Sequence, residues 1–464
     1  MSLKKNILRV FSANFIQLLS SIIVGFFVPA ILSVDGYASL KTYTLYISYI
    51  GMLSFGFIDG IYIKYGGQNI DNIDKGILKG EHYFLITFQF IIMITFFIIS
   101  VLTKDIIIFL FAITILPTVM VGFHQNLNQA TGNFKKYTRM MYIYSILYMV
   151  INVILALIFK SQNYIYYCVV SFICNLIVFI IYEYKFMKQL TGIKAVINKK
   201  DIINNMKIGF FILLGNIAVI SFYSIDKWFV KLLLSTQDFA FYSFAISMLN
   251  IVNTLITAIS IIFYNYLFNN NSKEKIKRLE TYLLILGSIA SISYFVLAFI
   301  VNNFIEKYLP SLDIIAITFA TFPYLVVIKA LIVNLYKVNE NKKQYVKVVS
   351  YMLIVSIIYN IIAYTISHSM QAIALATLCA FITWYIYSSI TVKNLCLDKK
   401  NLIFTFFITI IFLLTSHLNN YIIGGLVYTI TLIICIITLY KDITKEILQF
   451  AKIGVQQKLK MKSL

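Results

Sequence analysis

Residues 82–102 read HYFLITFQFIIMITFFIISVL and contain no Asp, Glu, Lys or Arg. After a three-residue break, residues 106–123 form a second such run, IIIFLFAITILPTVMVGF. An α-helix rises about 1.5 Å per residue, so each run is long enough to cross a hydrocarbon core of about 30 Å. We therefore predict that both runs are transmembrane helices joined by a short turn.

Apolar runs of this kind continue through the whole chain. Of its 464 residues, 60% are hydrophobic and 12% are charged, whereas a soluble domain has about 25% charged residues. This composition excludes a water-soluble fold and predicts an all-α polytopic membrane protein. We expect fourteen transmembrane helices, at residues 10–32, 42–63, 82–102, 106–123, 140–159, 164–183, 207–226, 239–267, 281–301, 314–335, 347–366, 370–391, 402–416 and 421–440.

The basic residues predict the orientation of the chain. Most of the 39 Lys and Arg lie in the two termini and in the loops that follow even-numbered runs. By the positive-inside rule, both termini of this multi-pass protein are then expected in the cytoplasm. The formal charge of +21 reflects this topology and contact with the anionic bilayer surface, so no nucleic-acid partner is expected.

Two halves of the chain resemble each other in sequence. At an offset of 208 (341 minus 133), the residues of the loop after the fourth run match those after the tenth: Asn133, Lys135 and Tyr137 fall on Asn341, Lys343 and Tyr345. Parallel repeats of six helices around a central cavity are a transporter arrangement. We predict a six-helix bundle at 1–190, a basic cytoplasmic linker at 191–206, a second six-helix bundle at 207–395, two additional helices at 396–440 and a basic cytoplasmic tail at 441–464.

Amide side chains recur inside the predicted helices. Asn14 and Gln17 share one face of the first helix, Asn216 aligns with Asn14 in the second half, and Asn250 and Asn253 share one face of the eighth helix. An amide facing lipid would be left without hydrogen bonds, so these faces should point into the bundle. They either join helices or line a hydrophilic path for substrate.

Two charged residues, Lys329 and Asp59, lie inside the predicted spans rather than at a first or last residue. Lys329 lies deep in the tenth helix and should face protein or a water-filled cavity, where it contacts an anionic substrate; the alternative is that its side chain snorkels to the membrane interface. Asp59 lies between Gly56 and Gly60, a small-xxx-small face that permits close helix approach. Its carboxylate pairs with Lys64, binds a coupling cation or is solvated at the edge of the following loop.

A charged group closes the seventh helix at the side opposite the cytoplasm. It comprises Asp226 and Lys227, followed by Lys231. An anchoring ion pair at the membrane interface explains these residues, and so does a substrate or coupling-ion site at the mouth of a cavity.

Signatures of several kinds of chemistry are missing from the sequence. A GxxxxGK[ST] motif for ATP does not occur, nor do HExxH, GxSxG or paired catalytic carboxylates, so we do not expect an enzyme. The four His and five Cys are scattered without metal-ligand spacing, and we expect reduced cysteines, no metal site and no cofactor. A coupling ion, Na⁺ or H⁺, could still drive transport.

Several short motifs resemble those of a known family. Residues 56–67, GFIDGIYIKYGG, resemble the second-span signature of Wzx-type polysaccharide flippases. The segments 224–229 (SIDKWF) and 239–245 (FAFYSFA) resemble the junction of the seventh and eighth spans in that family, and 133–137 (NFKKY) resembles its cytoplasmic loop before the fifth span. The order of the motifs extends the resemblance over nearly the whole chain.

The resemblance implies the multidrug/oligosaccharidyl-lipid/polysaccharide exporter superfamily. Its Wzx-type members move undecaprenyl-pyrophosphate-linked oligosaccharide repeat units to the outer leaflet by alternating access, for O-antigen or capsule synthesis, beside a polysaccharide polymerase and chain-length proteins. The cationic lumen of the family maps onto Lys329, Lys231 and Lys227, and its cation-coupling acid onto Asp59 or Asp226.

Three alternatives remain open at the level of sequence. A cation-coupled multidrug exporter of the same superfamily would share the fold. A membrane glycan polymerase or glycosyltransferase would usually carry a large loop or a cytoplasmic domain, which the short connections here do not provide. A flippase for lipid-linked peptidoglycan precursor would share both the fold and the class of substrate.

Overall fold

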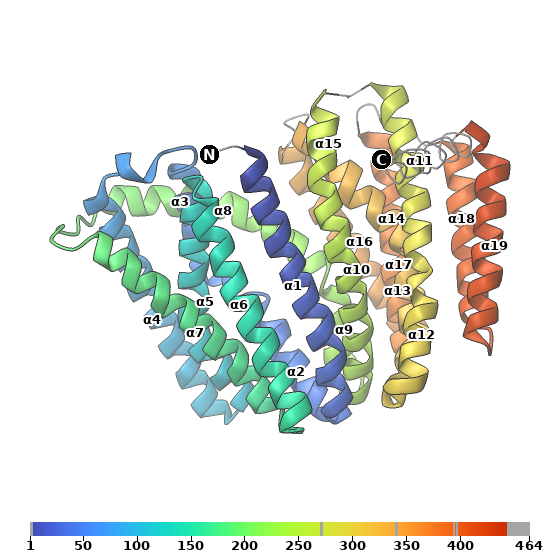
Figure 1. Ribbon diagram of the computed structural model, residues 1–464, viewed down its shortest axis with the longest axis horizontal. Coiled ribbons are helices and arrows are strands. Elements are labelled where there is room, and N and C mark those ends of the chain that lie inside the picture. Colours follow the sequence, from blue (N-terminus) through green and yellow to red (C-terminus); the bar gives the residue numbers. More distant parts are fainter. Residues whose placement is uncertain (1–2, 270–271, 339–341, 393–394, 396–397, 443–464) are drawn as a thin grey trace, which may run out of the picture. The chain divides into compact units, whose positions relative to one another are not determined.

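The computed structural model describes residues 3–269, 272–338, 342–392, 395 and 398–442, and its regular elements in these ranges are helices (Figure 1). The chain divides into two compact units. Unit 1 comprises Met1–Ala258 and Val346–Ile358, and unit 2 comprises Ile259–Tyr345 and Tyr359–Leu464. Each unit is described separately below.

Unit 1 is formed by ten helices with short connecting turns, together with the middle of α16 (Lys342–Ile366). The ten are α1 (Leu3–Ile31), α2 (Val34–Ile47), α3 (Phe57–Lys64), α4 (Lys75–Thr103), α5 (Ile106–Ala130), α6 (Phe134–Val153), α7 (Tyr164–Gln189), α8 (Lys199–Phe222), α9 (Ile225–Leu233) and α10 (Thr236–Asn269), the last of which continues into unit 2. Helix α5 is central, because it packs against α2, α3, α4, α6 and α7.

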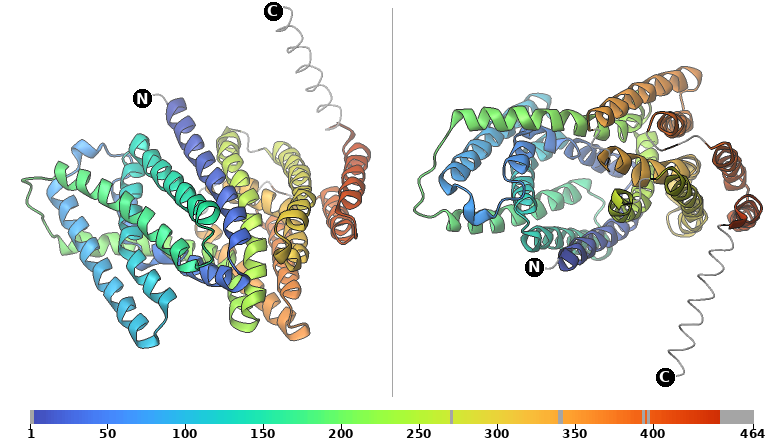
Figure 2. Two further views of the ribbon diagram at one scale, coloured as in Figure 1. Left: turned by 60° about the horizontal axis from the view of Figure 1, so that its bottom comes forward. Right: turned by 90° about the horizontal axis from the view of Figure 1, so that it is seen from above.

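Unit 2 contains α11 (Lys273–Ser291), α12 (Ser293–Phe304), α13 (Leu312–Phe319), α14 (Phe322–Val327), α15 (Val333–Val338), α17 (Met370–Thr391), α18 (Lys399–Ser416) and α19 (Tyr421–Leu439). Helix α11 packs against α14, and α13 packs against α17. Helices α18 and α19 run side by side (Figure 2), and they attach to the unit through α11, α12 and α13.

Local sequence explains where many of these helices begin. The Asp74 carboxylate accepts hydrogen bonds from the backbone N–H groups of Gly76 and Ile77, at 2.8 and 3.0 Å. Asp105 caps α5 in the same way, through the N–H groups of the second and third residues after it. Because the first N–H groups of a helix have no partner within the helix, such caps are needed most where water is scarce.

Lipid acts as the solvent for the outer surface. Helix α4 exposes a continuous set of apolar side chains: Phe90, Ile91, Ile94, Phe97, Ile98, Val101 and Leu102. Among the described residues, eleven helices are long and apolar enough to span a membrane, or up to 13 if each bent pair counts as one span. The remaining predicted span, 239–267, falls in α10, where many side chains lie outside the described residues, so the count of fourteen stays a prediction.

Two spans that the sequence predicts as continuous are bent. The second breaks at Phe55 and Gly56, whose φ values are 48° and 80°, and its two parts meet at 56°. Both residues adopt the left-handed conformation, which glycine tolerates because it has no Cβ. The tenth span breaks between α13 and α14 with a bend of 49°. Each of these two predicted spans is therefore formed by a bent pair of helices.

The small-xxx-small face predicted at Gly56 and Gly60 packs closely against α8. A Cβ added to Gly60 would lie 2.1 Å from the Asn205 carbonyl oxygen, and one added to Gly209 would lie 1.7 Å from the Gly56 carbonyl oxygen. Such distances leave no room for any side chain, so the two helices touch backbone to backbone. The predicted close helix approach is confirmed.

Candidate functional site

Two adjoining cavities lie within unit 1, with volumes of about 260 and 210 Å³. They share Lys41, Thr44, Ser247 and Asn250, so they form one hollow, which we call the lysine cavity. Its other walls come from α1, α2, α6, α9 and α10, and they consist of Ser21, Val24, Gly25, Val28, Tyr37, Leu40, Leu45, Ser48, Tyr148, Lys227, Ser243, Ile246, Ile251 and Thr254. Among the residues that the structure describes, the lining contains two lysines and several neutral polar groups but no carboxylate.

The first lysine of the cavity, Lys41, lies on α2. The Lys41 ammonium donates a hydrogen bond to Ser247 Oγ at 2.8 Å and lies 5.0 Å from the centre of the Tyr37 ring. The ring lies one helical turn before Lys41, so the cation–π contact is set by i, i+4 spacing. Within the part of the chain that the structure describes, no acidic side chain forms an ion pair with this ammonium.

The second lysine of the cavity, Lys227, lies on α9. Lys227 lines the same cavity as Lys41, beside Ser243 and Asn250. Its neighbour Asp226 is buried and accepts hydrogen bonds from the Tyr242 hydroxyl at 2.8 Å and from the Lys227 backbone N–H at 2.7 Å. Among the described residues, no side-chain ion pair of the Lys227 ammonium occurs, so two lysines face one cavity without a carboxylate in its lining.

Lys231, one turn further along α9, has a different environment. Its ammonium donates to Thr42 Oγ1 at 3.0 Å and lies 5.5 and 5.4 Å from the ring centres of Tyr46 and Phe239. It is absent from the lining of the lysine cavity. The two lysines predicted at the end of the seventh helix therefore differ in position. Lys227 lines the lysine cavity, whereas Lys231 lies against aromatic rings outside it.

A second cavity of about 270 Å³ in unit 1 contains Asp59, and we call it the aspartate cavity. Asn216 of α8, Asn126 and Thr118 of α5, and Ser54 also line it. The structure thus joins two residues that the sequence selected separately, Asp59 and Asn216. A carboxylate surrounded by amide and hydroxyl oxygens is a donor set that suits a hard cation such as Na⁺ or a proton.

The pairing of Asp59 with Lys64, one of its three sequence interpretations, does not occur. The Lys64 ammonium instead contacts Glu81 Oε1 at 2.7 Å and Asp201 Oδ2 at 3.2 Å. Tyr65 and Asn205 also donate to Glu81, at 2.6 and 2.7 Å. Asp59 is therefore left facing its cavity without an ion pair among the described residues.

The predicted amides have mixed positions. Asn250 lines the lysine cavity together with Ser21 and Thr254, which lie on the polar faces predicted for the first and eighth helices. This arrangement favours the hydrophilic path over helix joining for those faces. Asn14 and Asn253 are half-buried and Gln17 is exposed. None of the three lines the lysine cavity or the aspartate cavity.

Lys329 belongs to unit 2. It lies in a π-helical turn, Ile328–Ile332, between α14 and α15, and its neighbours Ile328 and Ala330 are fully buried. The side chain is half-buried, which agrees with the expectation that it faces protein or water. Single π-helical turns are common at functional sites. Contact of Lys329 with substrate remains a proposal.

Two features were missed at the level of sequence. Lys41 directly precedes the predicted second span, where a lone lysine is typical of an interfacial anchor, and its i, i+4 spacing to Tyr37 was the available signal. The histidines are scattered in the sequence, but the structure brings His82 and His124 together, because both contact the Glu183 carboxylate. These residues lie far apart in the chain, so their meeting depends on helix packing. The expectation of no metal site stays a prediction.

Comparisons with known proteins agree on the fold. The chain is similar to the structure of the lipid II flippase MurJ in an inward closed conformation, with a TM-score of 0.65 and 14% identity, over 94% of this chain and 99% of that one. It is also similar to an inward-facing multidrug resistance MATE family transporter of the MOP superfamily, with a TM-score of 0.54 and 13% identity, over 82% of this chain and 95% of that one. No family model and no curated protein sequence matches the chain. The predicted all-helical, multi-pass membrane fold is thereby confirmed, and the chain shares it with these two proteins.

Proposed function

We propose that this chain is a flippase that moves an undecaprenyl-pyrophosphate-linked oligosaccharide repeat unit across the cytoplasmic membrane, for surface polysaccharide synthesis. The lysine cavity carries the proposal, because Lys41 and Lys227 face it and its lining has no carboxylate. Placing ammonium groups in a poorly solvated site is costly unless an anion meets them. A pyrophosphate would supply that anion.

Each group of the cavity has a distinct role in this proposal. Lys41 and Lys227 act as point charges on the phosphate oxygens, since lysine has no planar fork for bidentate binding. Asn250, Ser247 and Thr254 offer neutral hydrogen-bonding groups for the adjoining sugar. The lipid tail stays in the bilayer, and the two halves of the transporter alternate between inward and outward access. Lys329 is proposed as a further contact to the substrate.

The aspartate cavity is proposed to couple transport to an ion gradient. Its carboxylate binds Na⁺ or H⁺ with help from Asn126 and Asn216. Asp226 is less suited to this task, since its carboxylate is engaged by Tyr242 and a backbone N–H. The same cavity favours the second candidate function, a cation-coupled multidrug exporter, whose cationic substrates would need an acid in the path.

Replacing Asp59 by Asn is expected to uncouple transport from the ion gradient. The amide keeps the size of the side chain but neither carries charge nor takes up a proton, and a lost charge-assisted contact costs about 1.5–3 kcal/mol. Gradient-driven accumulation of lipid-linked oligosaccharide in proteoliposomes should fall at least about tenfold. Asp71→Asn, in an exposed loop, serves as the matched control. Full gradient dependence in the Asp59 variant would exclude the aspartate cavity as the coupling site.

Deletion of the gene in its host tests the proposed substrate. We expect loss of surface polysaccharide and accumulation of undecaprenyl-linked repeat units on the cytoplasmic leaflet, measured by surface staining and by lipid extraction. Intact polysaccharide with increased sensitivity to cationic drugs would identify the multidrug exporter instead. Accumulation of peptidoglycan precursor would identify a flippase for that lipid.

A further inference from the structure

Three helices of unit 1 each place one metal-ligating side chain in a compact cluster. Helix α4 supplies His82, α5 supplies His124 and α7 supplies Glu183. His82 Nε2 lies 2.9 Å from Glu183 Oε1, and His124 Nε2 lies 3.1 Å from Glu183 Oε2. The exposed fractions of the two histidines are 1% and 2%, and that of the Glu183 side chain is 18%. Both imidazoles therefore direct the same nitrogen toward one carboxylate in a nearly dry site.

The dimensions of the cluster suit a small divalent transition metal. One ligand atom from each residue lies within 4.8 Å of the other two. Tetrahedral zinc with bonds of about 2.0–2.1 Å holds its ligand atoms about 3.3 Å apart. Small side-chain rotations would bring the atoms to that spacing. Two imidazoles and one carboxylate are ligands that zinc accepts, whereas calcium and magnesium prefer oxygen.

Aromatic rings pack against the histidines of the cluster. The His82 ring lies 4.9 Å from the Phe186 ring and 5.6 Å from the Phe123 ring, measured between centres. The His124 ring lies 5.3 Å from the Phe186 ring. Apolar surroundings of this kind limit access of water to a metal and strengthen its bonds to charged ligands.

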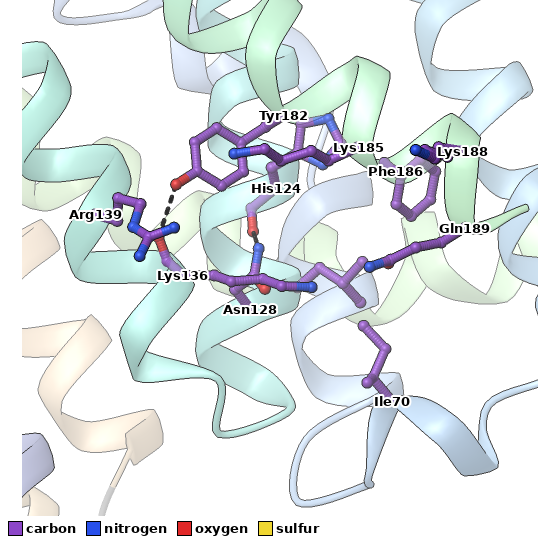
Figure 3. Close-up of a pocket in the computed structure, with 11 residues that line it drawn as sticks. Ile70, His124, Asn128, Lys136, Arg139, Tyr182, Lys185, Phe186, Lys188 and Gln189 are labelled. Carbon is purple, nitrogen blue, oxygen red and sulfur yellow. Dashed lines mark hydrogen bonds between the residues drawn. The ribbon is translucent and has the colours of Figure 1, made fainter.

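A cavity beside His124 leaves room for a fourth ligand. His124 lines a cavity of about 400 Å³, which we call the basic cavity, because Lys136, Arg139, Lys185 and Lys188 also line it. Figure 3 shows these side chains around His124. Their charge favours an anion over a neutral ligand at the open position of the metal.

We propose that His82, His124 and Glu183 bind one zinc-class transition metal ion, with its fourth position open to the basic cavity. The ion would tie together α4, α5 and α7 at the end of unit 1 where the basic loops gather. Without the ion, the same atoms form two imidazole–carboxylate hydrogen bonds, and this is the competing interpretation. The site is separate from the lysine and aspartate cavities, so its test does not depend on transport.

Metal binding by the full-length protein tests the proposal. The protein in nanodiscs is stripped with chelator and titrated with zinc chloride, and the bound metal is counted by mass spectrometry and calorimetry. We expect one zinc ion per chain and a higher thermal unfolding midpoint in zinc, because a ligand that binds only the folded state stabilises it. His124→Gln, which keeps a hydrogen-bond donor, should lose both effects. The double variant of the other two histidines, His368→Gln with His417→Gln, should keep both.

Cobalt substitution in the wild-type protein gives a second readout that needs no variant. Bound Co²⁺ should show the visible absorption of a four- or five-coordinate nitrogen and oxygen site. Thiolate charge-transfer bands would place the metal on cysteine and overturn the proposal. Three other results would also overturn the proposal: no zinc binding, equal binding by His124→Gln and the control variant, or a preference for Mg²⁺ or Ca²⁺. Each would favour a metal-free, hydrogen-bonded cluster.

Discussion

Substituting Lys41 and Lys227 together by methionine is expected to abolish transport and to leave the amount of folded protein unchanged. Each lysine would lose a charged contact to the pyrophosphate, worth about 1.5–3 kcal/mol, so the pair should reduce transport on the order of 100-fold or more. Methionine has nearly the shape of the lysine stem, and replacing a poorly solvated charge by an apolar side chain is often neutral or stabilising. Movement of lipid-linked oligosaccharide in proteoliposomes measures the effect.

Lys231→Met is the matched control for this pair. It lies on the same helix as Lys227, and its ammonium is held by Thr42 and two aromatic rings outside the lysine cavity. This variant should keep most of the activity. Normal transport by the double variant would contradict the role of the lysine cavity. An equal loss of transport in Lys231→Met would indicate that the substrate contacts Lys231 as well as the lysine cavity.

The membrane fold was predictable because its signal is local. Lipid cannot satisfy backbone hydrogen bonds, so every span must be a long apolar helix, and each is visible as a run of residues such as 82–102. The break at Gly56 was not visible in the same way. It follows from a positive φ and from the fit of α3 against α8, and the sequence shows only the small residues that permit such a fit.

The candidate site was only partly predictable because it is assembled from distant residues. Lys227 and Asn250 were selected by their unusual position inside or beside a span. Lys41 and Ser247 meet across 206 residues (247 minus 41), and neither alone is unusual in a sequence of this composition. Membrane interfaces commonly carry lone lysines and serines, so their pairing requires the packing of α2 against α10.

Two buried acids show what the sequence analysis could not select. Glu81 begins the apolar part of α4 and Glu280 begins that of α11. Each accepts a hydrogen bond from a tyrosine of its own unit, Tyr65 at 2.6 Å and Tyr385 at 2.7 Å. An acid beside a predicted loop is not unusual in sequence, so the burial of both depends on helix packing.

Replacing Gly209 by Ala is expected to destabilise unit 1 severely and to disable transport. The added Cβ would lie 1.7 Å from the Gly56 carbonyl oxygen and 2.7 Å from the Gly60 nitrogen. Overpacking usually costs about 1–3 kcal/mol, and backbone atoms cannot rotate away, so we expect about 3 kcal/mol or more. Lower thermal unfolding midpoints and less monodisperse protein in detergent should report the loss. Gly51→Ala, where the added Cβ meets no atom within 4 Å, is the control.

The same helix crossing also determines the geometry of the aspartate cavity. Asp59 lies on α3 beside Gly60, and Asn216 lies on α8 about two turns after Gly209, so the distance between the helices controls the distance between their polar groups. If the protein survives the Gly209 substitution in a lipid bilayer, ion coupling should be impaired more than substrate binding. Unfolding midpoints that match those of Gly51→Ala, with normal coupling, would mean that the close contact of α3 and α8 is not needed for stability or for the cation site.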